Sequence, residues 1–152
     1  MRQRIASARR KCASLDLSVN QPGDAAWVIE SWAQKWGIDQ GQPASATAVE
    51  DRIRIAEHLE PIGRHVTLVL RDGETPIAGA TNYVHDGTLV AGTLYRDDSI
   101  ESLPTGVRMI DAVFEYAAQQ HIETIDLGGG HDYKIRWAPE RAEHHELIVS
   151  PR

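Results

Sequence analysis

The sequence predicts an α+β fold in which a mixed, mostly antiparallel sheet is flanked by helices. Three observations predict it. Two stretches with helical periodicity follow a short first strand, three alternating strands are then joined by tight Asp-Gly turns, and a helix separates the last of these from a fifth strand. Such a helical crossover makes the fourth and fifth strands parallel neighbours. The length of 152 residues is typical of one domain, so residues 1–152 are expected to form a single unit.

The chain begins with a basic segment, residues 1–13, that contains no acidic residue. Its charged residues are Arg2, Arg4, Arg9, Arg10 and Lys11. We expect a short helix that is solvated or frayed, with contact to RNA as the alternative. Because the whole chain carries a net charge of −6, the remainder is more acidic still, and such a surface binds phosphate backbones poorly.

The first strand and two helices follow this segment. Residues 15–19 alternate apolar and polar side chains and predict the strand. Asp24 is the expected N-cap of a helix over 24–36, whose apolar stripe includes Trp32. A tryptophan on such a stripe usually belongs to the core, and the alternative is the wall of a pocket. Residues 37–45 are rich in glycine and polar side chains and predict a loop, and residues 49–59 predict the second helix.

The centre of the chain predicts three antiparallel strands. They are expected at residues 65–70, 77–84 and 88–95, with Asp-Gly turns at 72–73 and 86–87. Gly79 and Gly92 lie inside strands, where glycine weakens pairing and leaves no side chain to pack. We therefore expect a bulge or the close approach of another group at both positions.

The last part of the chain contains a run of three glycines. The expected elements around it are a polar connection at residues 96–103, a helix at 104–117, a strand at 124–127, one helical turn at 132–137 and a last strand at 146–150. Gly128, Gly129 and Gly130 follow the 124–127 strand, and each glycine loses much backbone freedom when it is ordered. The run therefore indicates positive φ angles or the close approach of a ligand, with a flexible loop as the alternative.

This order of elements resembles that of the GNAT acyltransferases. Pro104-Thr105-Gly106 opens an amphipathic helix, the strand IDLGGG follows, and HDYKIRW comes next. This pattern is similar to the CelD/BcsL type of GNAT domain, a relative of the FemAB-like transferases, which typically shows "DxGxG…YKxxW" at this place. Tyr133, Lys134 and Trp137 fit that signature, and of the usual GNAT phosphate loop Thr105 and Gly106 are present.

The resemblance implies an N-acyltransferase. The donor would be acetyl-CoA or another acyl-CoA, or an acyl carrier protein, and the acceptor an amine of a small molecule or an amino-acid-like compound. Two alternatives stay open, an aminoacyl-tRNA-dependent FemAB-like transferase and a non-catalytic GNAT-like binding module. The acidic body makes tRNA the less expected partner.

A donor site is expected where the 104–117 helix begins. A helix N-terminus has unpaired amides and partial positive charge, so residues 103–108 can hold an anion such as a pyrophosphate, and Arg108 would add charge. An ordinary helix start is the alternative. The resemblance places the donor across the splayed ends of the 88–95 and 124–127 strands, and the expected donor-binding residues are Leu94, Tyr95, Thr105, Gly106, Val107 and Arg108.

The catalytic and acceptor residues are expected after the glycine run. Tyr133 is the candidate acid for the leaving thiolate, because a phenol donates a proton without carrying a prior charge, and His131 or Asp132 is the candidate base. Packing and solvated turns are the alternatives for these side chains. The expected substrate-binding residues are Asp126, Gly129, Gly130, Lys134 and Trp32, with Asp126 orienting Lys134 through a salt bridge. Lys134 and Arg136 would bind phosphate or acceptor, or form structural ion pairs.

Composition narrows the class of protein further. No stretch approaches the roughly 20 apolar residues of a membrane span, so no membrane contact is expected. A single cysteine, Cys12, with no partner for a disulfide fits a reducing cytoplasm. No histidines or acids recur at metal-ligand spacing, so no metal is expected. A homodimer is one assembly that the sequence allows.

Overall fold

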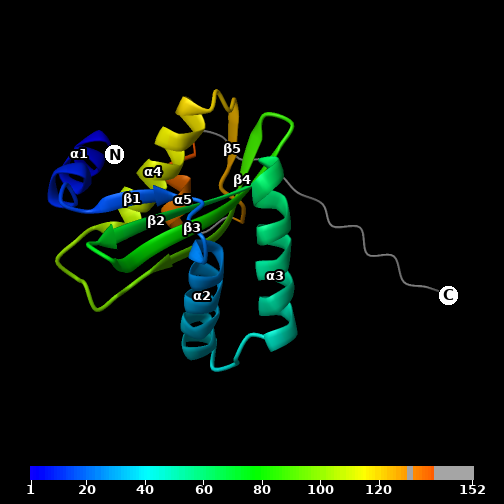
Figure 1. Cartoon of the computed structure of the whole chain (residues 1–152). Helices are drawn as coiled ribbons and strands as arrows, with labels where there is room; N and C mark the ends of the chain where they lie inside the picture. The colour runs from blue at the N-terminus through cyan, green and yellow to red at the C-terminus, as the bar shows by residue number, and fades with distance from the viewer. Residues whose placement is uncertain (130–131, 139–152) are drawn as a thin grey trace.

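The computed structural model describes residues 1–129 and 132–138 (Figure 1). In chain order its elements are α1 (Arg2–Lys11), β1 (Asp16–Val19), α2 (Asp24–Gln40), α3 (Ala46–Leu59), the 3-10 turn η1 (Glu60–Ile62), β2 (His65–Asp72), β3 (Thr75–His85), β4 (Thr88–Arg96), α4 (Thr105–Gln119), β5 (Thr124–Asp126) and α5 (Asp132–Ile135). The predicted last strand at 146–150 lies outside the described residues.

The five strands form one sheet in the order β1-β2-β3-β4-β5. Neighbours are antiparallel from β1 to β4, and β4 pairs with β5 in parallel. The predicted α+β class and the parallel last pair are therefore confirmed. The parallel pairing follows from α4, which carries the chain back across the sheet before β5 begins.

Helices cover both faces of the sheet (Figure 1). On one face, alternate residues of β2 and β3 form the main core with the apolar side of α4. Its buried members are Val66, Leu68, Leu70, Ile77, Ala78, Ala80, Leu89, Met109, Val113 and Ala117. On the other face α2 and α3 pack together through Ala25, Ile29 and Ala56, which form a smaller core. Helix α1 lies against α4.

Helix α2 is longer than predicted. It continues through Gly37 to Gln40 and ends at Gly41, whose φ is 67°. One glycine inside a helix costs about 1 kcal/mol relative to alanine, which the packing of the helix outweighs. A Cβ at position 37 would lie 3.1 Å from the Cα of Pro43, so glycine here lets the chain turn back closely against the helix. The prediction of a loop from residue 37 was therefore wrong for its first four residues.

Asp24 is not the N-cap that the sequence predicted. Gly23, with φ 86°, occupies the cap, and Asp24 is the first helical residue, only 2% exposed. Its carboxylate accepts a hydrogen bond of 3.0 Å from the Ser18 hydroxyl and forms an ion pair with the Arg71 guanidinium. A neighbouring strand thus supplies a stronger partner for Asp24 than the amides of its own helix.

The two glycines inside strands stand where other groups come close. A Cβ at Gly79 would lie 2.4 Å from Cγ2 of Val28 on α2. A Cβ at Gly92 would lie 2.8 Å from the carbonyl oxygen of Thr81, beside an irregularity in the pairing of β3 with β4. The expectation for both glycines is confirmed. Among the described residues, no helix is both long and apolar enough to cross a membrane.

Candidate active site

The sheet opens between β4 and β5. The two strands pair over only three positions, from Thr88–Thr124 to Val90–Asp126, while β4 continues to Arg96. The irregularity at Gly92 lies directly beyond the last pair. The far part of β4 therefore presents backbone groups that do not pair with β5, and two cavities lie at this opening.

The inner cavity has a volume of about 240 Å³ and is lined from both faces of the sheet. Its aromatic wall consists of Trp32 and Trp36 from α2 and Trp137, which follows α5. The remaining lining residues are Ala80, Asn82, Ala91, Gly92, Thr93, Leu94, Ile110, Val113, Leu127 and Lys134. Residues from both faces can meet in one cavity because the sheet is open at this point.

The three tryptophans are held in place by stacking. Trp32 and Trp36 stack with ring centroids 5.9 Å apart, and Trp137 stacks on Phe114 of α4 at 5.7 Å. The Arg52 guanidinium lies 4.9 Å from the Trp32 ring. Each such contact stabilises the fold by about 0.5–1.5 kcal/mol more than burial of the same surface would. The aromatic wall is therefore a fixed surface, and of the two roles weighed for Trp32 the structure favours the wall of a pocket.

The outer cavity has a volume of about 420 Å³ and shares Leu94, Ile110 and Trp137 with the inner one. The other residues that line it are Met1, Arg4, Lys35, Arg96, Gly106, Val107 and Arg136. Its four cationic side chains come from α1, α2, the end of β4 and the residues after α5. Among the described residues that line it there is no carboxylate. The outer cavity is thus suited to an anionic ligand.

The first turn of α4 lies in this outer cavity. No side chain caps the helix, and its first amide, that of Thr105, donates to the Leu103 carbonyl, whereas the amides of Gly106 and Val107 have no intrahelical carbonyl partner. Gly106 faces Arg96, and a Cβ at position 106 would lie 3.3 Å from the Arg96 Cδ. Thr105 is 1% exposed and does not line the cavity. The helix start therefore offers backbone donors and partial positive charge beside the four cations.

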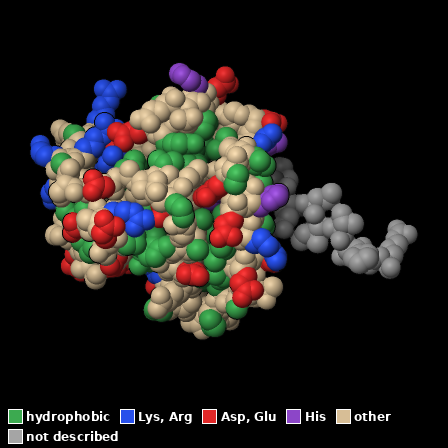
Figure 2. All heavy atoms as spheres, in the orientation of Figure 1, with side chains coloured by type: hydrophobic (Ala, Val, Ile, Leu, Met, Phe, Trp, Pro, Cys, Tyr) green, Lys and Arg blue, Asp and Glu red, His purple; other side chains and the backbone are tan. Residues whose placement is uncertain are grey.

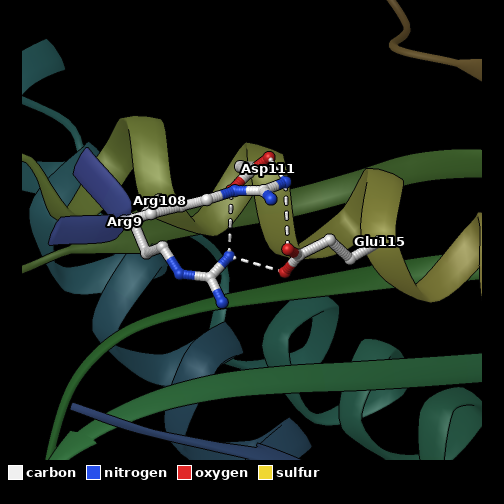
Figure 3. A network of polar contacts seen from close by, with 4 residues as sticks. All are labelled: Arg9, Arg108, Asp111 and Glu115. Atoms are coloured by element: carbon white, nitrogen blue, oxygen red, sulfur yellow. Dashed lines mark hydrogen bonds and ion pairs between the residues drawn. The ribbon is translucent and has the colours of Figure 1, made fainter. Parts of the chain in front are cut away.

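Arg108 does not line this cavity, and its side chain lies in an ion-pair cluster between α1 and α4 (Figure 3). Its guanidinium lies 3.1 Å from Asp111 and 2.8 Å from Glu115. Arg9 of α1 makes two hydrogen bonds of 2.7 Å to Asp111 and an ion pair of 3.0 Å with Glu115. The hydrogen bonds and charge of Asp111 raise the pKa of Arg9 above its ordinary range. The cation expected from Arg108 is instead supplied to the cavity by Lys35, Arg96, Arg4 and Arg136.

One carboxylate sits beside two of these cations. Asp98 forms an ion pair with Lys35 and lies 3.0 Å from Nε of Arg96. The hydrogen bond from Lys35 lowers the pKa of Asp98, with the Arg96 charge acting in the same direction, and burial opposes them. Asp98 thus links α2 to the end of β4 at the outer cavity and remains ionised at neutral pH.

The end of β5 is organised by its own side chains. The Asp126 carboxylate accepts a hydrogen bond of 2.7 Å from the amide of Gly128, whose φ is 69°. The Lys134 ammonium donates a hydrogen bond of 2.5 Å to the carbonyl of Leu127, tying α5 to the strand end. Burial lowers the pKa of Lys134, and the charge of Asp126 opposes this shift. The first glycine of the run therefore has the positive φ that the sequence indicated.

The other predicted residues have different positions. Leu94, Gly106 and Val107 line the outer cavity, whereas Tyr95 packs edge-on against Trp27 with ring centroids 5.3 Å apart. Burial raises the pKa of Tyr95, as do Asp97 and Asp98. Gly129 is exposed, and Gly130 and His131 lie outside the described residues. The backbones of Asp132 and Tyr133 begin α5, and their side chains are outside the description.

Sequence reasoning missed several lining residues. They are Arg4, Lys35, Trp36, Asn82 and Arg96. Trp36 carried a signal, because it follows Trp32 by one helical turn and therefore shares its face. Arg4, Lys35 and Arg96 carried no such signal, because each stands in a different element of the chain. Among the described residues no three His, Cys, Asp or Glu side chains gather as a metal site would require.

Comparison with known proteins places the chain among acetyltransferases. The family model described as "Acetyltransferase (GNAT) domain" matches residues 1–137. No curated protein matches the chain. A predicted acetyltransferase with acetyl-CoA from Clostridium acetobutylicum is 12% identical with a TM-score of 0.69, over 90% of this chain and 96% of that one. The aminoglycoside acetyltransferase meta-AAC0020 from an uncultured soil metagenomic sample, in complex with sisomicin, is 15% identical with a TM-score of 0.63, over 91% and 98%. A GNAT family acetyltransferase from Staphylococcus aureus is 10% identical with a TM-score of 0.64, over 90% and 99%.

Proposed function

The chain belongs to the GNAT acetyltransferase family, and on that premise we propose that it transfers an acyl group from acyl-coenzyme A to the amine of a small, amino-acid-like acceptor. One observation carries the proposal. Two adjacent cavities that share Leu94, Ile110 and Trp137 lie where the sheet opens between β4 and β5, the outer one cationic and the inner one aromatic. This pair matches a donor with charged phosphates at one end and a thioester at the other.

The residues of the outer cavity fit the phosphates of coenzyme A. Lys35 and Arg96 can pair with them, and the open first turn of α4 adds backbone donors at Gly106 and Val107. The close approach of Gly106 to Arg96 supports this fit, because any larger side chain would fill the space between helix and cation. The structure determined for the Clostridium neighbour contains acetyl-CoA, which supports the same donor.

The pantetheine arm would then follow the unpaired edge of β4 toward the inner cavity. Its amides can bond to backbone groups of the strand beyond Val90, as an added strand would. This path leads the thioester past Leu94, which lines both cavities, to the irregularity at Gly92 and Thr93. Acyl-coenzyme A supplies the activated acyl group, and the protein supplies its orientation.

The reaction requires proton transfers at the acceptor nitrogen and at the leaving sulfur. The acceptor ammonium must lose one proton before its nitrogen bonds to the acyl carbon, and the same nitrogen must lose a second proton as the amide forms; the sulfur that leaves as the carbon–sulfur bond breaks must gain one, so the two transfers in which the protein can act are at the ammonium and at the sulfur. We propose Tyr133 as the acid for the sulfur and His131 or Asp132 as the base for the ammonium. The support is their position directly after β5, on the backbone that Lys134 ties to the strand end.

The inner cavity indicates what kind of amine is accepted. Its walls of Trp32, Trp36 and Trp137 suit an apolar or aromatic portion of the acceptor. Lys134 contributes positive charge and is suited to a carboxylate. The neighbour with sisomicin binds an aminoglycoside, whose several ammonium groups would be repelled by Lys134 and by the cations of the adjacent outer cavity. We therefore propose an acceptor with one amine, an apolar body and a carboxylate.

Donors other than acyl-coenzyme A are less well supported. A carrier protein presents pantetheine with a single phosphate, which leaves most of the four cations without a phosphate to bind. An aminoacyl-tRNA requires an extended basic surface, and the chain is acidic outside its first residues. The CelD/BcsL subtype, related to FemAB, rests on sequence signals only: Pro104-Thr105-Gly106 at the helix start, the glycine-rich turn, and Tyr133, Lys134 and Trp137 after it. A binding module without catalysis is the remaining alternative.

Calorimetry and a thiol-release assay test the proposal together. The wild-type protein should bind acetyl-CoA, and apolar amino acids in a panel of amines should accelerate coenzyme A release. Gly106→Glu should abolish donor binding, whereas Gln119→Glu, which adds the same charge at the far end of α4, should not. Binding of acetyl-CoA without release in the presence of any amine would identify a binding module. Failure to bind acetyl-CoA would refute the proposal.

A further inference from the structure

We propose that helix α1 is a wall of the donor site, with Arg4 binding a phosphate of the coenzyme A nucleotide and Arg9 holding the helix in position. The inference rests on the proposed function, because it concerns the same donor. It assigns a ligand-binding role to a segment whose charges the sequence suggested were merely solvated. Several basic side chains gather over the end of the molecule that α1 forms (Figures 1 and 2).

The first observation is the state of the cations in the outer cavity. Lys35 and Arg96 share the carboxylate of Asp98. In the described part of the chain, no ion pair involves Arg4 or Arg136, although both line the same cavity. Like charges gathered in one cavity repel one another, so the arrangement is unfavourable until an anion joins it. A ligand with several phosphates would relieve this repulsion.

Coenzyme A has the charges that such a cavity requires. It carries a pyrophosphate and a separate phosphate on its ribose, and therefore brings several anionic groups to the four cations. A guanidinium pairs with a phosphate through two parallel hydrogen bonds, which suits Arg4 and Arg136 better than lysines would. Arg4 therefore extends the phosphate-binding surface beyond the start of α4, where Gly106 and Val107 line the cavity.

The second observation is how α1 is fixed. Its apolar anchor is small, with Ala8 buried on α4 and Cys12 buried just beyond the helix end. Arg9 also forms ion pairs with Asp111, whose side chain is 5% exposed, and with Glu115 (Figure 3). Because a helix moves as a stiff body, fixing Arg9 fixes Arg4, about one and a half turns earlier on the same helix. Arg9 is thus a positioning residue that acts through Arg4.

The matched control for Arg4 is on the same helix. Arg10 is exposed, lines neither cavity and forms no ion pair in the described part of the chain. Arg4→Gln and Arg10→Gln therefore remove the same charge from the same element. Since Arg4 is also exposed, neither substitution should lower the melting temperature appreciably.

The experiment is calorimetric titration with coenzyme A and with 3′,5′-ADP, the fragment that has phosphates but no pantetheine. Arg4→Gln should weaken binding of both ligands about tenfold, the usual loss for one charge-assisted contact, and the loss should shrink in high salt. Arg4→Lys should recover part of the affinity, and Arg10→Gln should bind as the wild type does. Adding Arg9→Gln to Arg4→Gln should cause no further loss, although Arg9→Gln alone weakens binding.

Each failure has a distinct meaning. If the wild type binds coenzyme A and Arg4→Gln matches Arg10→Gln, α1 is no part of the donor site and the proposed function still stands. If the losses of Arg9→Gln and Arg4→Gln multiply, Arg9 does not act through Arg4, and its assignment is overturned. If the wild type binds neither ligand, the proposed function fails first.

Discussion

Replacing Asp98 by asparagine should strengthen donor binding. Asp98 lies beside Lys35 and Arg96, the two cations that we expect to meet a phosphate. A phosphate entering the outer cavity would find its own charge opposed by this carboxylate. Asparagine has nearly the same shape and can still accept hydrogen bonds from both cations, so the substitution removes mainly the charge.

The size of the effect follows from Coulomb's law. Asp98 is 54% exposed, so its field is close to that of a charge in water. A unit charge about 5 Å from a phosphate then costs about 1 kcal/mol, or roughly fivefold in Kd. At about 1 M salt the Debye length is about 3 Å, so the gain should largely disappear. The lost surface pair contributes about 0–1 kcal/mol to stability, which corresponds to a few degrees in Tm at most.

The assay is titration with acetyl-CoA at low and high salt. The control is Glu101→Gln, an exposed acid in the same connection without an ion pair among the described residues. It changes the net charge equally and should leave the Kd almost unchanged. Weaker binding by Asp98→Asn than by Glu101→Gln would refute the reasoning, because it would mean that Asp98 orients the two cations rather than competing with the phosphate.

Three further outcomes are expected. Tyr133→Phe should lower kcat by roughly 10²–10⁴-fold with unchanged donor affinity if the phenol protonates the leaving sulfur, and a wild-type rate would remove it as the acid. Burial lowers the pKa of His65 below its ordinary 6.5. The neutral imidazole therefore contributes fully to the free energy of unfolding above pH 6.5, and this contribution is lost as the pH falls toward the folded-state pKa. In urea unfolding at about pH 7.5 and 5.5, His65→Gln should lose less free energy of unfolding on acidification than the wild type does, and an equal loss in both proteins would contradict this. Gly79→Ala should reduce the free energy of unfolding by about 1–3 kcal/mol, because its methyl group would meet Val28 at 2.4 Å. Gly129→Ala is the control, because a Cβ at position 129 would have no atom within 4 Å. An equal loss of unfolding free energy in both variants would show that the clash with Val28 is not the cause.

The order of elements and the place of the opening could be predicted from the sequence. Alternation in β2, β3 and β4 and the Asp-Gly turns between them depend on residues within a few positions of one another. The turn at Asp86 and Gly87 has the positive φ angles, 46° and 73°, that such pairs favour. Gly79 and Gly92 marked close approaches because a missing side chain in a strand interior is itself a local signal.

Side-chain direction and long-range charge pairing were decided only by the tertiary structure. Asp24 does not cap its helix because its carboxylate pairs instead with Arg71 of β2, 47 residues away. Arg108 turns from the cavity to Asp111 and Glu115, and Arg9 joins them across 102 residues. The cations that do line the outer cavity come from four elements whose meeting no local pattern encodes. Sequence periodicity specifies which face of an element is buried, whereas the partner of each charge is chosen only when those faces are packed together.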